Sequence, residues 1–88
     1  MSDVNSIEMP ETLGVIAGLG TYPWQLARSA HAQGVKRVVA FAFKGETERV
    51  IGKYADEVVW MHLGRLQALL DAVKAQGVRK IVMAGQIK

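Results

Sequence analysis

The chain has 88 residues, of which 50% are hydrophobic and 22% charged, so the composition predicts one small globular domain and not a disordered chain. Because there is no cysteine, disulfides, thiolate nucleophiles and cysteine-ligated metals are also excluded. The net charge of +3 comes from 11 scattered basic residues, a weak bias toward small anionic ligands, and we expect no nucleic-acid partner. No apolar stretch approaches the roughly 20 residues that span a bilayer.

The N-terminal residues 1–12 form a polar lead-in that lacks the basic start and apolar core of a secretory signal. We expect the ordered domain to cover residues 13–88. It opens with the apolar run Leu13–Ala17, which is typical of a strand buried on both faces. A helix is predicted over Tyr22–Gln33, with Gly34 in the position of a helix-ending glycine.

The rest of the chain continues to alternate between strand and helix patterns. The predicted elements are a strand over Val35–Phe43, a short helix over Thr47–Tyr54, a strand over Glu57–Met61, a helix over Leu63–Gln76 and a strand over Arg79–Ala84. Such alternation predicts an α/β fold with a four-stranded parallel sheet and right-handed crossovers. We expect the strand order 3-2-1-4 with helices on both faces, as in half of a dinucleotide-binding fold.

The turn after the first strand is the first candidate site, because ligands of parallel α/β proteins bind at the carboxyl ends of strands. Gly18 and Gly20 can adopt positive φ and admit a ligand to the backbone. The N–H groups of Thr21, Tyr22 and Trp24 would then face outward at the start of the helix and bind an anion. A tight turn without a ligand explains the spacing equally well.

This glycine turn matches neither of the two standard phosphate-binding motifs. Pro23 occupies the third glycine position of the dinucleotide fingerprint, and no Gly-Lys-Ser/Thr follows as in a P-loop. In the predicted strand order, the first and fourth strands are neighbours. The turn at Gly18 and Gly20 should therefore face the turn at Gly85 and Gln86 across a crevice.

Few other residues point to chemistry. His31 falls late in the first helix and His62 follows the third strand, and neither has an acidic partner at ligand spacing in the sequence. Lys44 and Glu46 could meet the phosphate and ribose of NAD(P), although a solvated loop explains them better. We therefore predict no catalytic residue and no metal ligand on this segment.

Three segments together resemble the N-terminal domain of the LpxI type of UDP-2,3-diacylglucosamine pyrophosphatase. They are Leu13–Pro23, Asp56–Leu66 and Val82–Lys88, and the resemblance covers residues 13–88. It implies a Rossmann-like domain of a bacterial, Mg²⁺-dependent enzyme. That enzyme hydrolyses the pyrophosphate of UDP-2,3-diacylglucosamine to UMP and 2,3-diacylglucosamine 1-phosphate (lipid X) in lipid A biosynthesis.

The resemblance also implies which parts of the enzyme lie elsewhere. Most catalytic acids and the Mg²⁺ ligands are expected in a C-terminal domain that this chain lacks, so the chain alone should be inactive. The substrate-binding residues that we predict lie in its two turns: Gly18, Leu19, Gly20, Thr21, Tyr22, Gly85, Gln86 and Lys88.

The expected partners are the lipid-linked nucleotide diphosphate and the C-terminal domain, and the resemblance allows a homodimer. It places the enzyme in the cytoplasm, in peripheral contact with the inner membrane. Two alternatives stay open: a nucleotide- or NAD(P)-binding regulatory domain without catalysis, and a structural piece that packs against a partner.

Overall fold

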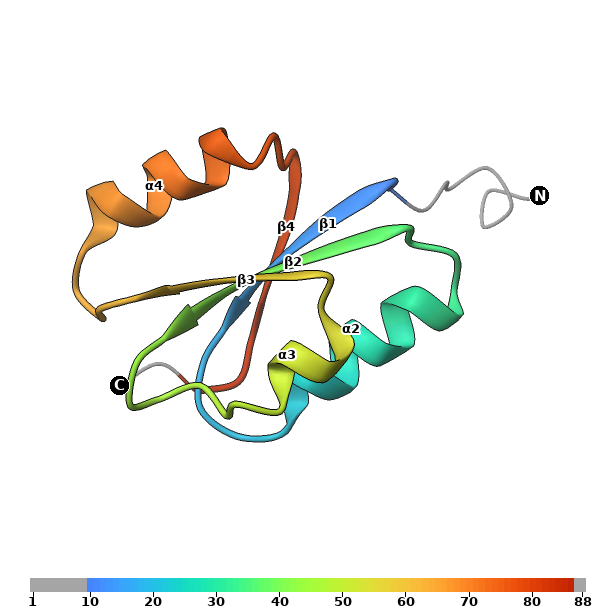
Figure 1. Cartoon of the computed structure of the whole chain (residues 1–88), viewed down its shortest axis with the longest axis horizontal. Helices are drawn as coiled ribbons and strands as arrows, with labels where there is room; N and C mark the ends of the chain where they lie inside the picture. The colour runs from blue at the N-terminus through green and yellow to red at the C-terminus, as the bar shows by residue number, and fades with distance from the viewer. Residues whose placement is uncertain (1–9, 87–88) are drawn as a thin grey trace.

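A computed structural model describes residues 10–86 as a three-layer α/β domain (Figure 1). Its elements in chain order are β1 (Thr12–Ala17), α2 (Tyr22–Ala32), β2 (Arg37–Phe43), α3 (Ile51–Tyr54), β3 (Glu57–Met61), α4 (Leu66–Ala75) and β4 (Lys80–Ala84). The four strands form one parallel sheet in the order β3-β2-β1-β4, which confirms the predicted fold class and strand order. Helices α2 and α3 cover one face of the sheet, and α4 covers the other (Figure 1).

Strand β2 forms the centre of the core because it pairs with strands on both sides and lies between helices on both faces. Every residue from Val38 to Phe43 is buried. Side chains alternate along the strand, so Val38 and Ala40 pack in the cluster under α2 and α3, while Val39 and Phe41 pack in the cluster under α4. The continuous apolar run is thus the pattern of a strand with both faces covered.

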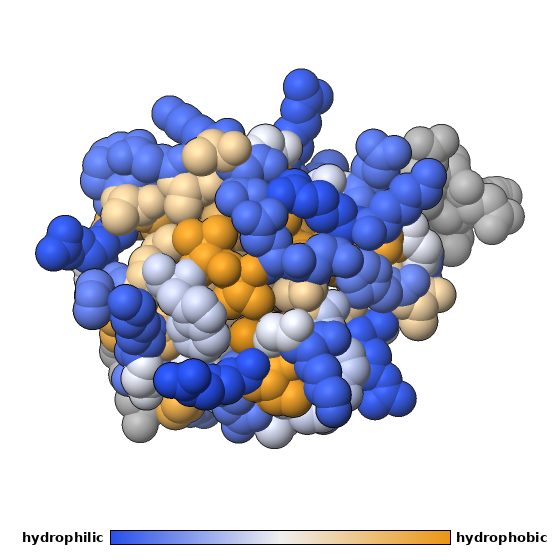
Figure 2. Space-filling view, viewed as in Figure 1, coloured by the Kyte–Doolittle hydropathy of each residue, from blue (hydrophilic) through white to orange (hydrophobic). Residues whose placement is uncertain are grey.

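The two faces of the sheet are not equally covered. On the α4 side, Leu66 is 68% exposed and Leu70 47% exposed, and Met83 of the edge strand β4 is 66% exposed. Figure 2 shows hydrophobic surface in the middle of one side of the molecule, bordered by hydrophilic residues. The α4 layer therefore leaves a large amount of apolar surface in contact with solvent.

Several helix and strand boundaries differ from the sequence prediction. Helix α4 begins at Leu66 and not at Leu63, because Gly64 has a φ of +91° and Arg65 lies outside the helical region. Helix α3 begins at Ile51 and not at Thr47, because the hydroxyl of Thr47 bonds the main chain of a preceding strand. None of the described helices is long and apolar enough to cross a membrane.

Polar side chains join the elements at the amino edge of the sheet. Asp56 Oδ2 accepts a 2.6 Å hydrogen bond from the Val38 N–H and lies 2.8 Å from His31 Nε2. Glu57 instead lies 3.0 Å from the guanidinium of Arg37. His31 thus has an acidic partner that its sequence spacing did not reveal, but at the edge opposite the predicted site.

A matched pair of glycine substitutions tests the packing of the core. A Cβ at Gly14 would lie 2.7 Å from Val78 Cγ1 and 3.2 Å from Phe41 Cε2. We expect Gly14→Ala to lower the free energy of unfolding by about 1–3 kcal/mol through overpacking. Gly52 lies in helix α3, and a Cβ there would meet no atom within 4 Å. Gly52→Ala should therefore raise the free energy of unfolding by up to about 1 kcal/mol. Urea denaturation measures both, and a neutral Gly14→Ala would contradict this packing.

Candidate functional site

Three turns meet at the carboxyl edge of the sheet. The turn after β1 pairs with the loop after β2 through Gly20 and Thr47, and with the turn after β4 through Leu19 and Gln86. These turns are far apart in the sequence, and the parallel sheet brings them to one edge. This edge is the one at which we predicted a ligand site.

The turns after β1 and β4 are in direct contact, so the predicted crevice between them is absent. Gly18 N–H donates to Ala84 O at 2.8 Å, and Leu19 N–H donates to Gln86 O at 2.8 Å. A Cβ at Gly85, which has a φ of +89°, would lie only 2.6 Å from Leu19 O. Gly85 is needed for this close backbone contact, and the N–H groups of Gly18 and Leu19 are already used within the chain.

The open part of the glycine turn lies at Gly20 and the start of α2. Gly20 has a φ of +102°, and a Cβ there would meet no atom within 4 Å. Thr21 and Tyr22 are exposed, whereas Pro23 is buried in the first turn of the helix. Gly18 does not use the positive φ that a glycine can adopt. The geometry thus narrows the candidate anion-binding backbone to Gly20, Thr21 and Tyr22.

A buried threonine holds the loop after β2 against the first strand. Thr47 is 7% exposed, and its hydroxyl accepts the Phe43 N–H at 2.8 Å and donates to Ala17 O. The hydroxyl therefore bridges the ends of β1 and β2. Sequence analysis missed this role, because the only signal was a threonine shortly after a strand.

Two hollows lie at this edge. One, of about 600 Å³, is lined by Lys44, Gly45, Thr47, Arg49 and Trp60. The other is an apolar groove of about 390 Å³, lined by Ile16, Phe43, Leu63, Gly64, Arg65, Leu66, Leu69, Leu70 and Met83. We call them the cationic hollow and the apolar groove. The cationic hollow is suited to an anion, and the apolar groove is suited to a hydrocarbon chain.

Comparison with known families gives one match. The family model described as the LpxI N-terminal domain matches residues 12–88. The chain belongs to the LpxI N-terminal domain family. This membership confirms the resemblance in the sequence and relates the chain to a bacterial enzyme of lipid A biosynthesis. No curated protein and no solved structure matches the chain.

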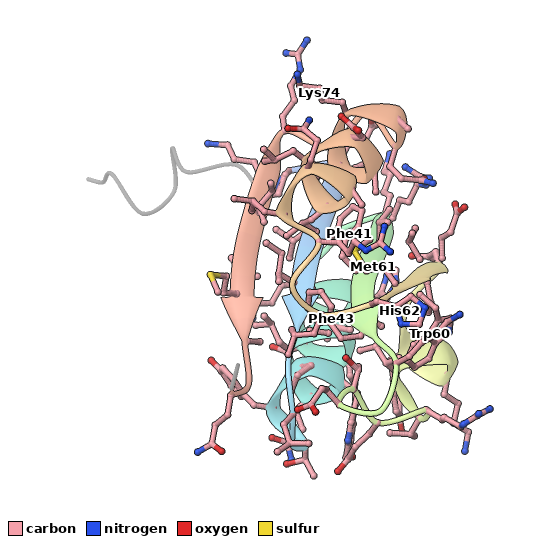
Figure 3. The ribbon with its side chains drawn as sticks, turned by 90° about the vertical axis from the view of Figure 1, so that its left-hand side faces the viewer. Phe41, Phe43, Trp60, Met61, His62 and Lys74 are labelled. Atoms are coloured by element: carbon pink, nitrogen blue, oxygen red, sulfur yellow. The ribbon has the colours of Figure 1, made fainter. Side chains whose placement is uncertain are left out.

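Other candidate residues of this LpxI-type domain lie apart from the open glycine turn or serve in packing. Trp24 stacks on Tyr54 at 5.3 Å and donates from Nε1 to Glu48 at 3.1 Å, so it is a packing residue. His62 is exposed and follows directly after the end of β3 (Figure 3). Lys88 lies outside the described residues.

The Mg²⁺ ion that we expect from the resemblance does not fit the described side chains of the candidate site. Within residues 10–86, no three His, Asp or Glu side chains come together as a metal site would require. The glycine turn offers N–H groups, which bind anions and not cations. We therefore derive no chemistry from a metal held by this part of the chain.

The Thr47 bridge can be tested by changing its hydroxyl. Thr47→Val keeps the shape but leaves the buried Phe43 N–H without its acceptor, so we expect a loss of about 1–3 kcal/mol in the free energy of unfolding. Thr47→Ser keeps the hydroxyl and should lose less. Urea denaturation of both variants measures the difference, and equal stability of Thr47→Val and the unchanged chain would refute the bridge.

Proposed function

We propose that this chain is the N-terminal, substrate-contacting domain of a UDP-2,3-diacylglucosamine diphosphatase. The full enzyme would hydrolyse the pyrophosphate bond to give UMP and 2,3-diacylglucosamine 1-phosphate. The observation that carries the proposal is the family match over residues 12–88. A second observation supports the proposal: the carboxyl edge of the sheet carries both exposed backbone N–H groups and an apolar groove.

The geometry of the edge supports an amphiphilic substrate. Backbone N–H groups at Thr21 and Tyr22 are suited to phosphate oxygens, and Gly20 leaves room for them. The apolar groove on the α4 side is suited to acyl chains, because its lining is almost entirely hydrocarbon. A lipid-linked nucleotide diphosphate needs both kinds of surface within one site.

The groups that break the pyrophosphate bond are proposed to lie outside this chain. A C-terminal domain would supply the catalytic carboxylates and the ligands of Mg²⁺, which would polarise the phosphoryl oxygens. We further propose a cytoplasmic enzyme in peripheral contact with the inner membrane, where its substrate resides, and homodimer formation is compatible with this arrangement.

A regulatory NAD(P)-binding domain is the alternative, and the geometry favours it less. The third glycine of the dinucleotide fingerprint is replaced by Pro23, which is buried at the start of α2. Glu46, the candidate ribose ligand, is absent from the lining of the cationic hollow. Lys44 does line that hollow and is compatible with either ligand.

The proposal predicts a division of labour between two domains. The 88-residue chain alone should release no UMP from UDP-2,3-diacylglucosamine in the presence of Mg²⁺, because among the described residues no three His, Asp or Glu side chains come together as a metal site. The full-length enzyme should release UMP, as should the chain co-expressed with its C-terminal domain. Hydrolysis by the purified chain alone would contradict the proposal, and so would an inactive full-length enzyme.

Substitution of two glycines with similar positive φ values distinguishes a role in substrate binding from a role in folding. Gly20 has a φ of +102° and Gly34 one of +108°, and neither Cβ would meet an atom within 4 Å. Alanine at either position should therefore cost a similar amount of stability, of order 1–3 kcal/mol. Gly34 lies at the opposite edge of the sheet, after α2, and serves as the control.

In the full-length enzyme, we expect Gly20→Ala to lower kcat/KM at least about tenfold more than Gly34→Ala, because it displaces the backbone that positions the phosphates. Melting temperatures should fall by similar amounts in the two variants. Equal kcat/KM values for the two variants would mean that Gly20 is needed only for the conformation of the turn and not for substrate binding.

A further inference from the structure

We propose that the cationic hollow binds the uridine monophosphate half of the substrate, with Lys44 and Arg49 on the phosphate and Trp60 stacked on the base. This inference rests on the proposed function for the identity of the base. The binding of a nucleoside phosphate rests on the hollow itself, which has room for one at about 600 Å³.

The loop that carries the two cations has a defined conformation. The N–H groups of Glu46 and Thr47 both donate to Phe43 O at 3.0 Å, and Gly45 turns the chain with a φ of +82°. Lys44 N–H donates to Met61 O at 2.9 Å, which fixes the first residue after β2 to the last residue of β3. The hollow is therefore organised before any ligand binds, which reduces the entropic cost of binding.

The charges of the hollow are available to an anion. Among residues 10–86, neither Lys44 nor Arg49 forms an ion pair with a carboxylate. The nearby Glu48 accepts a hydrogen bond from Trp24 instead and does not line the hollow. Two cations match the charge of about −1.5 to −2 on a phosphate monoester at neutral pH.

Trp60 supplies an aromatic surface beside these charges. It is 38% exposed, although it belongs to a strand of the sheet. Its strand neighbours Val59 and Met61 pack under α4, so by alternation Trp60 lies on the opposite face, where Arg49 and Thr47 also line the hollow. Figure 3 shows it at the end of β3. An exposed indole next to cations is suited to stacking on a base.

The two hollows together would orient the substrate. Phe43 lines the apolar groove and the next residue, Lys44, lines the cationic hollow, so the end of β2 separates a hydrocarbon surface from a charged one. An acylated sugar joined through a pyrophosphate to uridine has the same separation of polarity. The nucleotide would lie toward β3, and the acyl chains would lie along α4.

Titration of the ¹⁵N-labelled 88-residue chain with UMP, uridine and inorganic phosphate tests the inference by NMR. The chain has two indole N–H groups, and that of Trp24 serves for comparison because Trp24 does not line the hollow. We expect UMP to shift the Trp60 indole signal more than that of Trp24. UMP should also bind more tightly than uridine or phosphate.

Single substitutions separate the contributions to UMP binding. Lys44→Ala and Arg49→Ala should each weaken binding about tenfold, and Trp60→Ala about fivefold or more. Lys36→Ala removes one charge at the amino edge and is the control, with affinity unchanged within about twofold. The three variants of exposed cations should keep the melting temperature, whereas Trp60→Ala should lower it, because that side chain is only 38% exposed.

Any of three results would overturn the inference. The chain could fail to bind UMP at millimolar concentration, or it could bind phosphate as tightly as UMP with no effect of Trp60→Ala. Finally, Lys36→Ala and Lys44→Ala could lower the affinity for UMP equally. Failure here is distinct from failure of the proposed function. If the full-length enzyme hydrolyses its substrate but this chain does not bind UMP, only the inference about the hollow is wrong. If this chain binds UMP but the full-length enzyme is inactive, only the proposed function is wrong.

Discussion

The hydroxyl of Thr47 is the contact on which the arrangement of the carboxyl edge depends. It accepts from Phe43 N–H and donates to Ala17 O, so it ties the loop after β2 to the end of β1. That loop then lies beside the open turn at Gly20 and carries Lys44 into the cationic hollow. Without the hydroxyl, a buried N–H would lose its acceptor and the loop would lose its anchor.

The second constraint is the unequal covering of the two faces of the sheet. Helices α2 and α3 bury their side, whereas α4 leaves Leu66 and Met83 exposed around the apolar groove. Apolar surface that is exposed to water is unfavourable unless something covers it. We propose that the acyl chains of the substrate cover the groove. The incomplete covering of this face by α4 would then serve substrate binding.

Much of the fold could be predicted from the sequence, because the apolar run of β2 and the turn glycines are local signals. The alternation of elements predicted the parallel sheet, and the analogy with half of a dinucleotide-binding fold predicted its strand order. The details of the site could not be predicted, because they join distant residues. The Thr47 hydroxyl meets Ala17 across 30 positions, and Leu19 pairs with Gln86, which turns a predicted crevice into a direct contact. The hollow around Trp60 likewise needs the folded sheet.

The central claim is that substrate contacts this domain at the carboxyl edge of its sheet. Amide shifts of the ¹⁵N-labelled chain, titrated with UDP-2,3-diacylglucosamine in detergent and compared with detergent alone, test it most directly. Glycine amides at both edges give a clear contrast. The account predicts shifts at Gly20 and Gly45 with Gly34 and Gly77 unmoved. Shifts at Gly34 and Gly77 without change at Gly20 and Gly45 would contradict it.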